Sequence, residues 1–207
     1  MAAKAQSLER AAELLRAGQL VAFPTDTVYG LGAPAFDAAS VAAIYVAKQR
    51  PPEKAIPILI ADEADLLRIA ASVPEVARKL IARFWPGGLT LVLPKCPDVP
   101  EIVSADMTVA VRIPDLDLAR ALMRLTGPLA ATSANRSSQP SPVTASEVMA
   151  QLGGRIAALL DGGPCPGGTP STVVDCVSSP ARVVREGAIS LADLCAIVPG
   201  VCGASER

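Results

Sequence analysis

The order of hydrophobic and polar positions predicts how this chain alternates between helices and strands. Apolar residues between positions 8 and 15 recur at helical spacing, so we expect a helix that Ser7 caps and Gly18 ends. The apolar run at 20–23 is too short for a helix and predicts a strand. Pro24 cannot donate to a strand ladder, so we expect this strand to end there.

The same periodicities continue to position 197. Several predicted strands are joined by loops that are too short to contain a crossover helix. These short loops favour a mixed sheet over a purely parallel one. We therefore predict an α/β fold, a twisted mixed sheet with flanking helices in a single domain, 1–207, with its core at about 8–197 and a short C-terminal tail. Pro57 predicts an edge position or an irregular start for its strand. Helices are expected at 37–48, 62–70, 72–84, 116–125, 144–153 and 191–197, and strands at 56–60, 89–93, 108–112, 129–131, 171–175 and 182–185.

The segment 24–32, PTDTVYGLG, places polar groups directly after the first strand. Since Pro24 ends ladder pairing, we expect these groups to be displayed rather than buried. Hydroxyls, a carboxylate and a phenol can hydrogen-bond a small polar ligand, while Gly30 and Gly32 permit close backbone approach or a positive φ. A turn whose polar groups satisfy one another explains the same residues equally well.

Composition narrows the possible chemistry. Half of the 207 residues are hydrophobic, and the formal charge is −1, so the chain can bury a core but carries no general basic signature for nucleic acid. The chain has no histidine, which excludes a histidine-based triad, an imidazole proton shuttle and the common zinc sites.

Cysteine usage and hydropathy indicate a reducing compartment. The five cysteines are odd in number and form no Cys-x-x-Cys motif, so we expect reduced thiols that mostly fill the core, with a reactive cysteine as the lesser alternative. No apolar run reaches the length of a membrane span, and the N-terminus lacks a signal-peptide core. We expect a cytoplasmic protein that contacts no membrane.

The basic cluster Lys48-x-Arg50 with Lys54 lies at the end of a predicted helix and in the following loop. A helix C-terminus favours cations, so a solvated capping cluster is one interpretation. The other is a triphosphate clamp, in which Arg50 supplies a planar fork and the lysines supply point charges. The sequence pattern alone does not separate the two.

Two further polar clusters follow predicted strands. Ser133-x-Asn135 places a hydroxyl and an amide two residues apart, which is also common in ordinary turns. Ser171 and Thr172 offer a hydroxyl pair near a strand end, and Arg185 offers a guanidinium at another. Exposed polar residues that bind no ligand would explain each cluster equally well.

Taken together and in order, seven segments closely resemble the YrdC family of threonylcarbamoyl-AMP synthases. The resemblance covers about residues 8–197 and implies the YrdC-like fold in its short, single-domain form. Its hallmark elements, Lys-x-Arg and Ser-x-Asn, are here Lys48-x-Arg50 and Ser133-x-Asn135. The segments are 24–32 (PTDTVYGLG), 48–51 (KQRP), 84–90 (FWPGGLT), 111–114 (VRIP), 132–135 (TSAN), 171–175 (STVVD) and 185–188 (REGA).

This resemblance implies a nucleotidyltransferase that makes threonylcarbamoyl-AMP and pyrophosphate from L-threonine, bicarbonate and ATP, with Mg²⁺ accompanying ATP. The product would pass to a tRNA threonylcarbamoyl transferase for N6-threonylcarbamoyladenosine in tRNA. No metal ligand is assigned. The resemblance implies that Lys48 and Arg50 are catalytic, that threonine is bound by Thr27, Tyr29, Arg112 and Ser171, and that ATP is bound by Arg50, Lys54, Thr108, Ser133, Asn135, Ser141 and Arg185.

The chain departs from the family pattern at two positions. Ala55 and Leu59 stand where the family often has proline and histidine, which affects the threonine pocket more than the nucleotide site. The chemistry tolerates the missing histidine, because a carboxylate nucleophile is already anionic. The reaction needs positioning and cancellation of phosphate charge, which lysines, arginines and Mg²⁺ can supply.

Two alternatives belong to other classes. A non-catalytic module that binds double-stranded RNA or tRNA is one, although near-neutral charge and few aromatic residues disfavour strong nucleic-acid binding. The other is a carbamoyl-adenylate domain that uses carbamoyl phosphate. Domains of that kind usually lie in longer chains.

Overall fold

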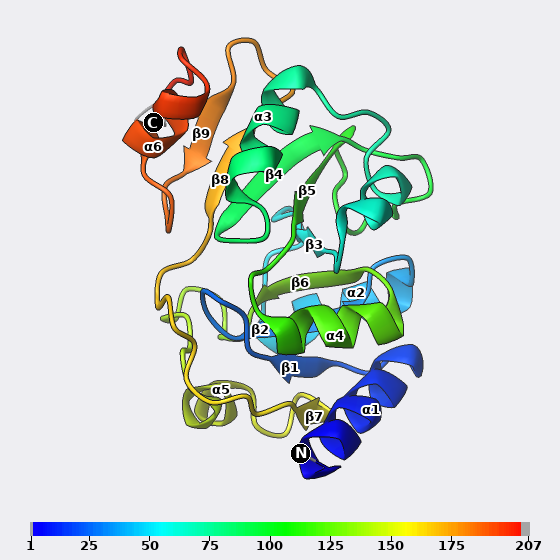
Figure 1. Ribbon diagram of the computed structural model, residues 1–207. Helices are drawn as coiled ribbons and strands as arrows, with labels where there is room; N and C mark the ends of the chain where they lie inside the picture. The colour runs from blue at the N-terminus through cyan, green and yellow to red at the C-terminus, as the bar shows by residue number, and fades with distance from the viewer. Residues whose placement is uncertain (1, 204–207) are drawn as a thin grey trace.

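The computed structural model describes residues 2–203, with side chains described from residue 7 onward, and its strands form one mixed sheet (Figure 1). The strands are β1 Val21–Phe23, β2 Gly30–Pro34, β3 Ile58–Leu59, β4 Leu89–Pro94, β5 Thr108–Arg112, β6 Leu129–Ser133, β7 Ala158–Leu159, β8 Thr172–Asp175 and β9 Arg182–Arg185. Their order in the sheet is β7-β1-β2-β6-β3-β5-β4-β8-β9.

The sheet confirms the predicted α/β fold with mixed strand directions. β1 and β7, β3 and β5, and β4 and β8 pair in parallel, whereas the other neighbouring strands pair antiparallel. The helical segments are α1 Ala2–Arg16, α2 Ala38–Lys48, the 3₁₀ helix η1 Glu63–Arg68, α3 Glu75–Phe84, α4 Asp117–Thr126, α5 Ala145–Leu152 and α6 Leu191–Ile197.

Helices cover both faces of the sheet. Alternate residues of β6 pack against helices on opposite faces. Leu129 and Ala131 pack into a cluster with apolar residues of α1 and α4. Ala130, between them, packs into the larger cluster that contains Ile44 of α2. This alternation follows from the two-residue period of a strand. In Figure 1, α4 accordingly lies in front of β6 and α2 behind it.

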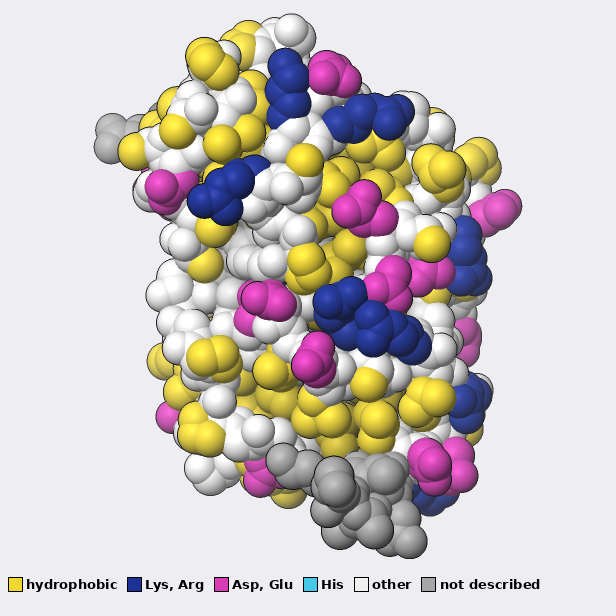
Figure 2. All heavy atoms as spheres, in the orientation of Figure 1, with side chains coloured by type: hydrophobic (Ala, Val, Ile, Leu, Met, Phe, Trp, Pro, Cys, Tyr) yellow, Lys and Arg dark blue, Asp and Glu magenta, His cyan; other side chains and the backbone are white. Residues whose placement is uncertain are grey.

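The surface carries no continuous basic stripe on the face drawn in Figure 2, where lysines and arginines are scattered among acidic side chains. Some of the basic residues are paired with acids: Asp62 accepts hydrogen bonds from both Arg120 and Arg124. Within residues 2–203, no helix combines the length and apolar character needed to cross a membrane.

Several predicted elements differ from the structure at their boundaries, among them the helix expected at 72–84, which begins at Glu75. The first helix begins at Ala2, so Ser7 lies inside it and is not its cap, although Gly18, with φ of +75°, follows its end as expected. The segment 62–70 forms the short 3₁₀ helix η1 in place of a longer helix. β3 begins at Ile58, directly after Pro57, and lies inside the sheet, so the irregular start is confirmed and the edge position is wrong.

The polar segment after β1 also differs from its prediction. Thr25, Thr27 and Tyr29 are buried rather than displayed. Gly30 and Gly32 have no positive φ and belong to β2, whose pairing with β1 was not expected. A Cβ on Gly32 would lie 2.8 Å from Cε1 of Phe23, so glycine is needed there for close packing against the aromatic ring.

Candidate functional site

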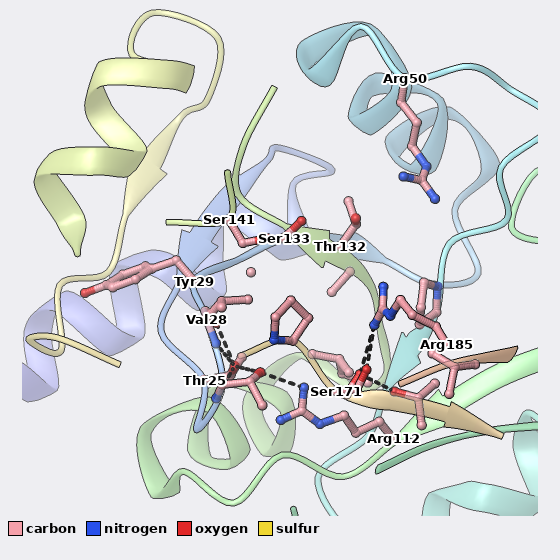
Figure 3. A pocket seen from close by; sticks show the side chains of 18 residues that line it. Thr25, Val28, Tyr29, Arg50, Arg112, Thr132, Ser133, Ser141, Ser171 and Arg185 are labelled. Atoms are coloured by element: carbon pink, nitrogen blue, oxygen red, sulfur yellow. Dashed lines mark hydrogen bonds between the residues drawn. The ribbon is translucent and has the colours of Figure 1, made fainter. Parts of the chain in front are cut away.

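A cavity of about 230 Å³ opens where the loop 24–29 meets the ends of β5 and β6 and the start of β8 (Figure 3). Pairing of β2 with β6 places Gly30 opposite Ser133, which joins the first polar segment to the Ser-x-Asn segment. Eight residues assigned by resemblance line this cavity together: Thr27, Tyr29, Arg50, Arg112, Ser133, Ser141, Ser171 and Arg185.

Arg112 lies at the end of β5, and its buried guanidinium is held on three sides. Nε donates to the carbonyl of Gly87 at 2.8 Å, Nη1 donates to Oγ1 of Thr27 at 2.9 Å, and Nη2 forms an ion pair with Asp26. Burial lowers the pKa of Arg112, and the Asp26 carboxylate opposes that shift. Arginine stays charged through such shifts, so the cavity keeps a fixed guanidinium here.

Arg50 and Arg185 also line the cavity (Figure 3), and the hydrogen bonds that anchor them within the described residues go to oxygen atoms of neutral groups. Arg50 donates to the carbonyls of Lys54 at 3.1 Å and Ala55 at 2.8 Å. Arg185 donates to the carbonyl of Ser171 at 2.7 Å. Burial lowers the pKa of both guanidinium groups; at Arg50 the Tyr45 phenol opposes that shift, and the charge of Arg185 adds to it. Both charges are therefore available to an anionic ligand.

The hydroxyls near Arg112 form a directed chain. Thr25 Oγ1 donates to the carbonyl of Val28 at 2.7 Å, which uses its one proton. Thr25 Oγ1 therefore donates no proton to Thr27 in their 3.0 Å contact, and it also accepts from the backbone N–H groups of Thr27 at 3.2 Å and Val28 at 3.3 Å. Because Thr27 Oγ1 also accepts from Arg112, its remaining lone pair can accept a hydrogen bond from a ligand.

The Tyr29 side chain points away from the centre of the cavity in Figure 3. Its hydroxyl donates to the carbonyl of Gly163 at 2.8 Å and contacts Oδ1 of Asp161 at 3.1 Å. Burial is the main cause that raises the pKa of Tyr29 to about 12. The hydroxyl therefore ties the loop 24–29 to the segment around Gly163, and only the rest of the residue lines the cavity.

We accordingly expect Tyr29→Phe to cost about 1 kcal/mol of unfolding free energy through the lost hydrogen bond. Affinity for a small ligand should change less than about threefold, because the hydroxyl does not face the cavity. Denaturant titration and calorimetry of ligand binding check the two effects separately. A tenfold loss of affinity with unchanged stability would contradict this geometry.

Lys48 lies beneath the cavity wall and does not line it. The residue is 1% exposed, and its Nζ donates to the backbone carbonyls of Ser133 and Asn135. Burial, and to a smaller extent the charge of Arg50, lowers the pKa of Lys48 to about 7. The structure thus places this lysine as a brace between the end of α2 and the Ser-x-Asn segment.

Three more residues assigned by resemblance do not line the cavity. Lys54 is exposed, and its carbonyl accepts from Arg50. Thr108 begins β5, four residues from Arg112 and so roughly 13 Å along the strand. Asn135 is buried: its Nδ2 donates to two backbone carbonyls, while its Oδ1 has no hydrogen-bond partner within the described residues.

The cavity also includes hydroxyl residues that the sequence interpretation did not assign. Thr25, Thr90 and Thr132 all line it. Thr90 bonds Ser171 Oγ at 2.8 Å because β4 pairs with β8. Thr132 belongs to the segment 132–135 that carries the resemblance. Its position next to Ser133 could therefore have indicated that it lines the cavity.

The cavity offers little for direct binding of a metal ion. No acidic side chain is among the described residues that line it, and residues 2–203 contain no cluster of three or more His, Cys, Asp or Glu side chains suited to a metal. Mg²⁺ prefers oxygen ligands and often keeps several waters. The side chains present therefore fit a metal that enters on the phosphates of a ligand better than a resident ion.

The mixed sheet and this cavity define an α/β protein with a pocket lined by hydroxyl groups and three arginines. The chain belongs to the Sua5/YciO/YrdC family, described by the phrase telomere recombination, which it matches over residues 13–187. The resemblance to YrdC proteins is thereby confirmed.

Curated relatives carry the name threonylcarbamoyl-AMP synthase. The Bacillus subtilis protein is 45% identical over 194 residues, which is 92% of this chain and 56% of the relative. The Vibrio cholerae protein is 36% identical over 88% of this chain and 98% of its own length. The chain thus spans little more than half of the Bacillus relative but nearly all of the Vibrio one.

Solved structures show the same fold. Sua5 from Pyrococcus abyssi complexed with L-threonine matches with a TM-score of 0.93 and 42% identity, over 95% of this chain and 58% of that one. YciO from E. coli matches with a TM-score of 0.82 and 26% identity, over 90% and 92% of the two chains. The Pyrococcus abyssi Sua5 structure is thus similar to this chain in sequence as well as in fold.

Proposed function

We propose that this chain is a threonylcarbamoyl-AMP synthase that converts L-threonine, bicarbonate and ATP to threonylcarbamoyl-AMP and pyrophosphate. The observation that carries the proposal is the arrangement of arginines around one cavity. Arg112 is paired with an acid and bordered by hydroxyls, whereas Arg50 and Arg185 lack acidic partners among the described residues. One end suits an amino acid and the other a triphosphate. Names and the L-threonine complex of relatives support the same assignment.

The proposed chemistry begins at the amine of threonine. The amine adds to the carbon of bicarbonate, water leaves, and an N-carboxylate forms. An oxygen of that carboxylate attacks the α-phosphorus of ATP, forming a new O–P bond while the bond to the pyrophosphate oxygen breaks. Because the nucleophile is already an anion, the main contributions required of the protein are alignment and stabilisation of phosphate charge.

Residues of this chain divide these tasks. Arg112 would bind the threonine carboxylate, and Thr27 would accept a hydrogen bond from the amine. Arg50 and Arg185 would bind the triphosphate, with Ser133 and Ser141 nearby on the wall. Mg²⁺ would enter with ATP, held by phosphate oxygens and water.

The wider setting of the reaction is also a proposal. The adenylate is a reactive mixed anhydride, so a tRNA threonylcarbamoyl transferase would consume it to make N6-threonylcarbamoyladenosine. Direct contact with tRNA is not required by this scheme. Five free cysteines fit a reducing compartment, and we infer a cytoplasmic location from them.

Omission of each substrate in turn tests the function. With MgATP, we expect pyrophosphate release only when L-threonine and bicarbonate are both present, because threonine supplies the nitrogen of the attacking N-carboxylate and bicarbonate supplies its carbon and oxygens. Mass spectrometry should find threonylcarbamoyl-AMP in the same reaction. Equal release without threonine would overturn the proposal. Release with carbamoyl phosphate in place of threonine and bicarbonate would favour a carbamoyl-adenylate domain, and salt-dependent RNA binding without turnover would favour an RNA-binding module.

A further inference from the structure

Asp26 makes a buried ion pair with Arg112 but does not itself line the cavity. The two side chains are only 13% and 6% exposed. Burying such a pair costs desolvation that its own attraction often fails to offset, so a stability role is weakly supported. The Asp26 carboxylate acts instead on the charge of Arg112.

The pair makes the two ends of the cavity electrically different. Among the three lining arginines, only Arg112 has an acidic partner within the described residues. Asp26 offsets the charge of Arg112 itself, whereas the charges of Arg50 and Arg185 have no such offset among the described residues, and the charge of Arg185 also acts on Arg112. Without Asp26, all three guanidinium groups would attract phosphate oxygens in a similar way.

Arg112 can still bind a carboxylate when paired. A guanidinium has five N–H donors, and three of them are used by Gly87, Thr27 and Asp26. Two donors remain for a ligand. Thr27 Oγ1 keeps an acceptor lone pair nearby, which suits the amino group of the same ligand. Donors for a carboxylate and an acceptor for an amine thus lie side by side.

We propose that Asp26 is a positioning residue that makes the Arg112 end of the cavity select a zwitterion, an α-amino acid, over a simple anion. The inference rests on the proposed function, which places the amino acid at this end. Asp26 cancels the long-range field of Arg112, so an ammonium group is not repelled and a polyphosphate gains less there than at Arg50 and Arg185. The two substrates then bind in one orientation.

The test compares two ligands that differ in one charge. Calorimetry measures the affinities of L-threonine and 3-hydroxybutanoate, which lacks the amino group, for wild type and Asp26→Asn. Asparagine matches the size of aspartate and removes its charge. We expect wild type to prefer threonine by at least about tenfold, and the variant to lose roughly tenfold of that preference, the scale for one charge several ångströms away.

Asp62→Asn is the matched control, because Asp62 also pairs with arginines but lies outside the cavity. The preference of Asp62→Asn for L-threonine over 3-hydroxybutanoate should equal that of wild type. Asp26→Glu keeps the charge and should retain most of this preference. Equal losses for both ligands in Asp26→Asn would show a purely structural role and overturn the inference. Equal affinity of wild type for the two ligands would also overturn the inference, and this result does not depend on any variant being folded. Failure of wild type to bind threonine at all would instead overturn the proposed function.

Discussion

Arg50→Ala is expected to lower kcat/KM for pyrophosphate release by about 10²–10³-fold, the scale for losing one preorganised donor at a developing charge. Arg50 is fixed by two backbone carbonyls and has no acidic partner among the described residues, so its full charge faces the cavity. Neither water nor a neighbouring lysine can supply the same planar fork to phosphate oxygens.

Steady-state kinetics with ATP varied measures this loss. Lys79→Ala, which removes an exposed cation from α3, should leave turnover within about twofold because the side chain lies outside the cavity. Arg50→Lys should recover only part of the activity, since it restores charge without the fork. Near-normal turnover in folded Arg50→Ala would mean that the basic cluster only caps α2.

Much of the fold could be predicted where the sequence carries its own boundary signals. Asp37 caps α2 through its side chain, and Thr144 forms a capping box with Glu147 at α5, so that both helices begin where the expected ranges 37–48 and 144–153 begin. The first helix start was misplaced because an alanine-rich segment continues helical structure past a good capping residue. β2 was missed because its two glycines make sense only against the ring of Phe23, which is a tertiary contact.

The candidate site was predictable as a set of segments but not in the roles of single side chains. Lys48 and Arg50 are two residues apart, and the sequence suggested that they act together. Gln49 between them has a left-handed backbone, with φ of 53°, where α2 ends. The chain therefore turns between the two cations, so that Lys48 is buried under the Ser-x-Asn segment and Arg50 reaches the cavity. The partner of Arg112 could not be read from spacing at all.

The Lys48 brace leads to a prediction with a distinctive pH dependence. Lys48→Met keeps the length and apolar stem of the side chain and removes the donor, so two buried carbonyls lose their partner. An unsatisfied buried acceptor costs about 1–3 kcal/mol, and we expect a destabilisation of that order. The Ser-x-Asn segment should also loosen, which raises the ATP concentration needed for half-maximal pyrophosphate release.

The sign of the pH effect follows from the two pKa values of Lys48, about 7 in the folded chain against 10.5 ordinarily. Below pH 7 both states hold the proton, so the penalty for burying a charge is fully present and constant. Between about pH 7 and 10.5 the unfolded chain binds a proton that the folded chain does not, so stability rises with pH. The neutral amine still has two N–H donors, enough for both carbonyls.

Lys48→Met has no titrating group at this position, so the difference between wild type and variant isolates Lys48. We expect the stability advantage of wild type to be smallest at pH 6 and to grow by up to about 1.4 kcal/mol per pH unit between pH 7.5 and 9. Urea unfolding at pH 6, 7.5 and 9 measures this difference, and Lys79→Met, at an exposed lysine of α3, serves as the control substitution. Parallel curves for wild type and Lys48→Met would show that the buried amine keeps its proton in the folded chain, and the brace would then act as a charged clamp on the Ser133 and Asn135 carbonyls.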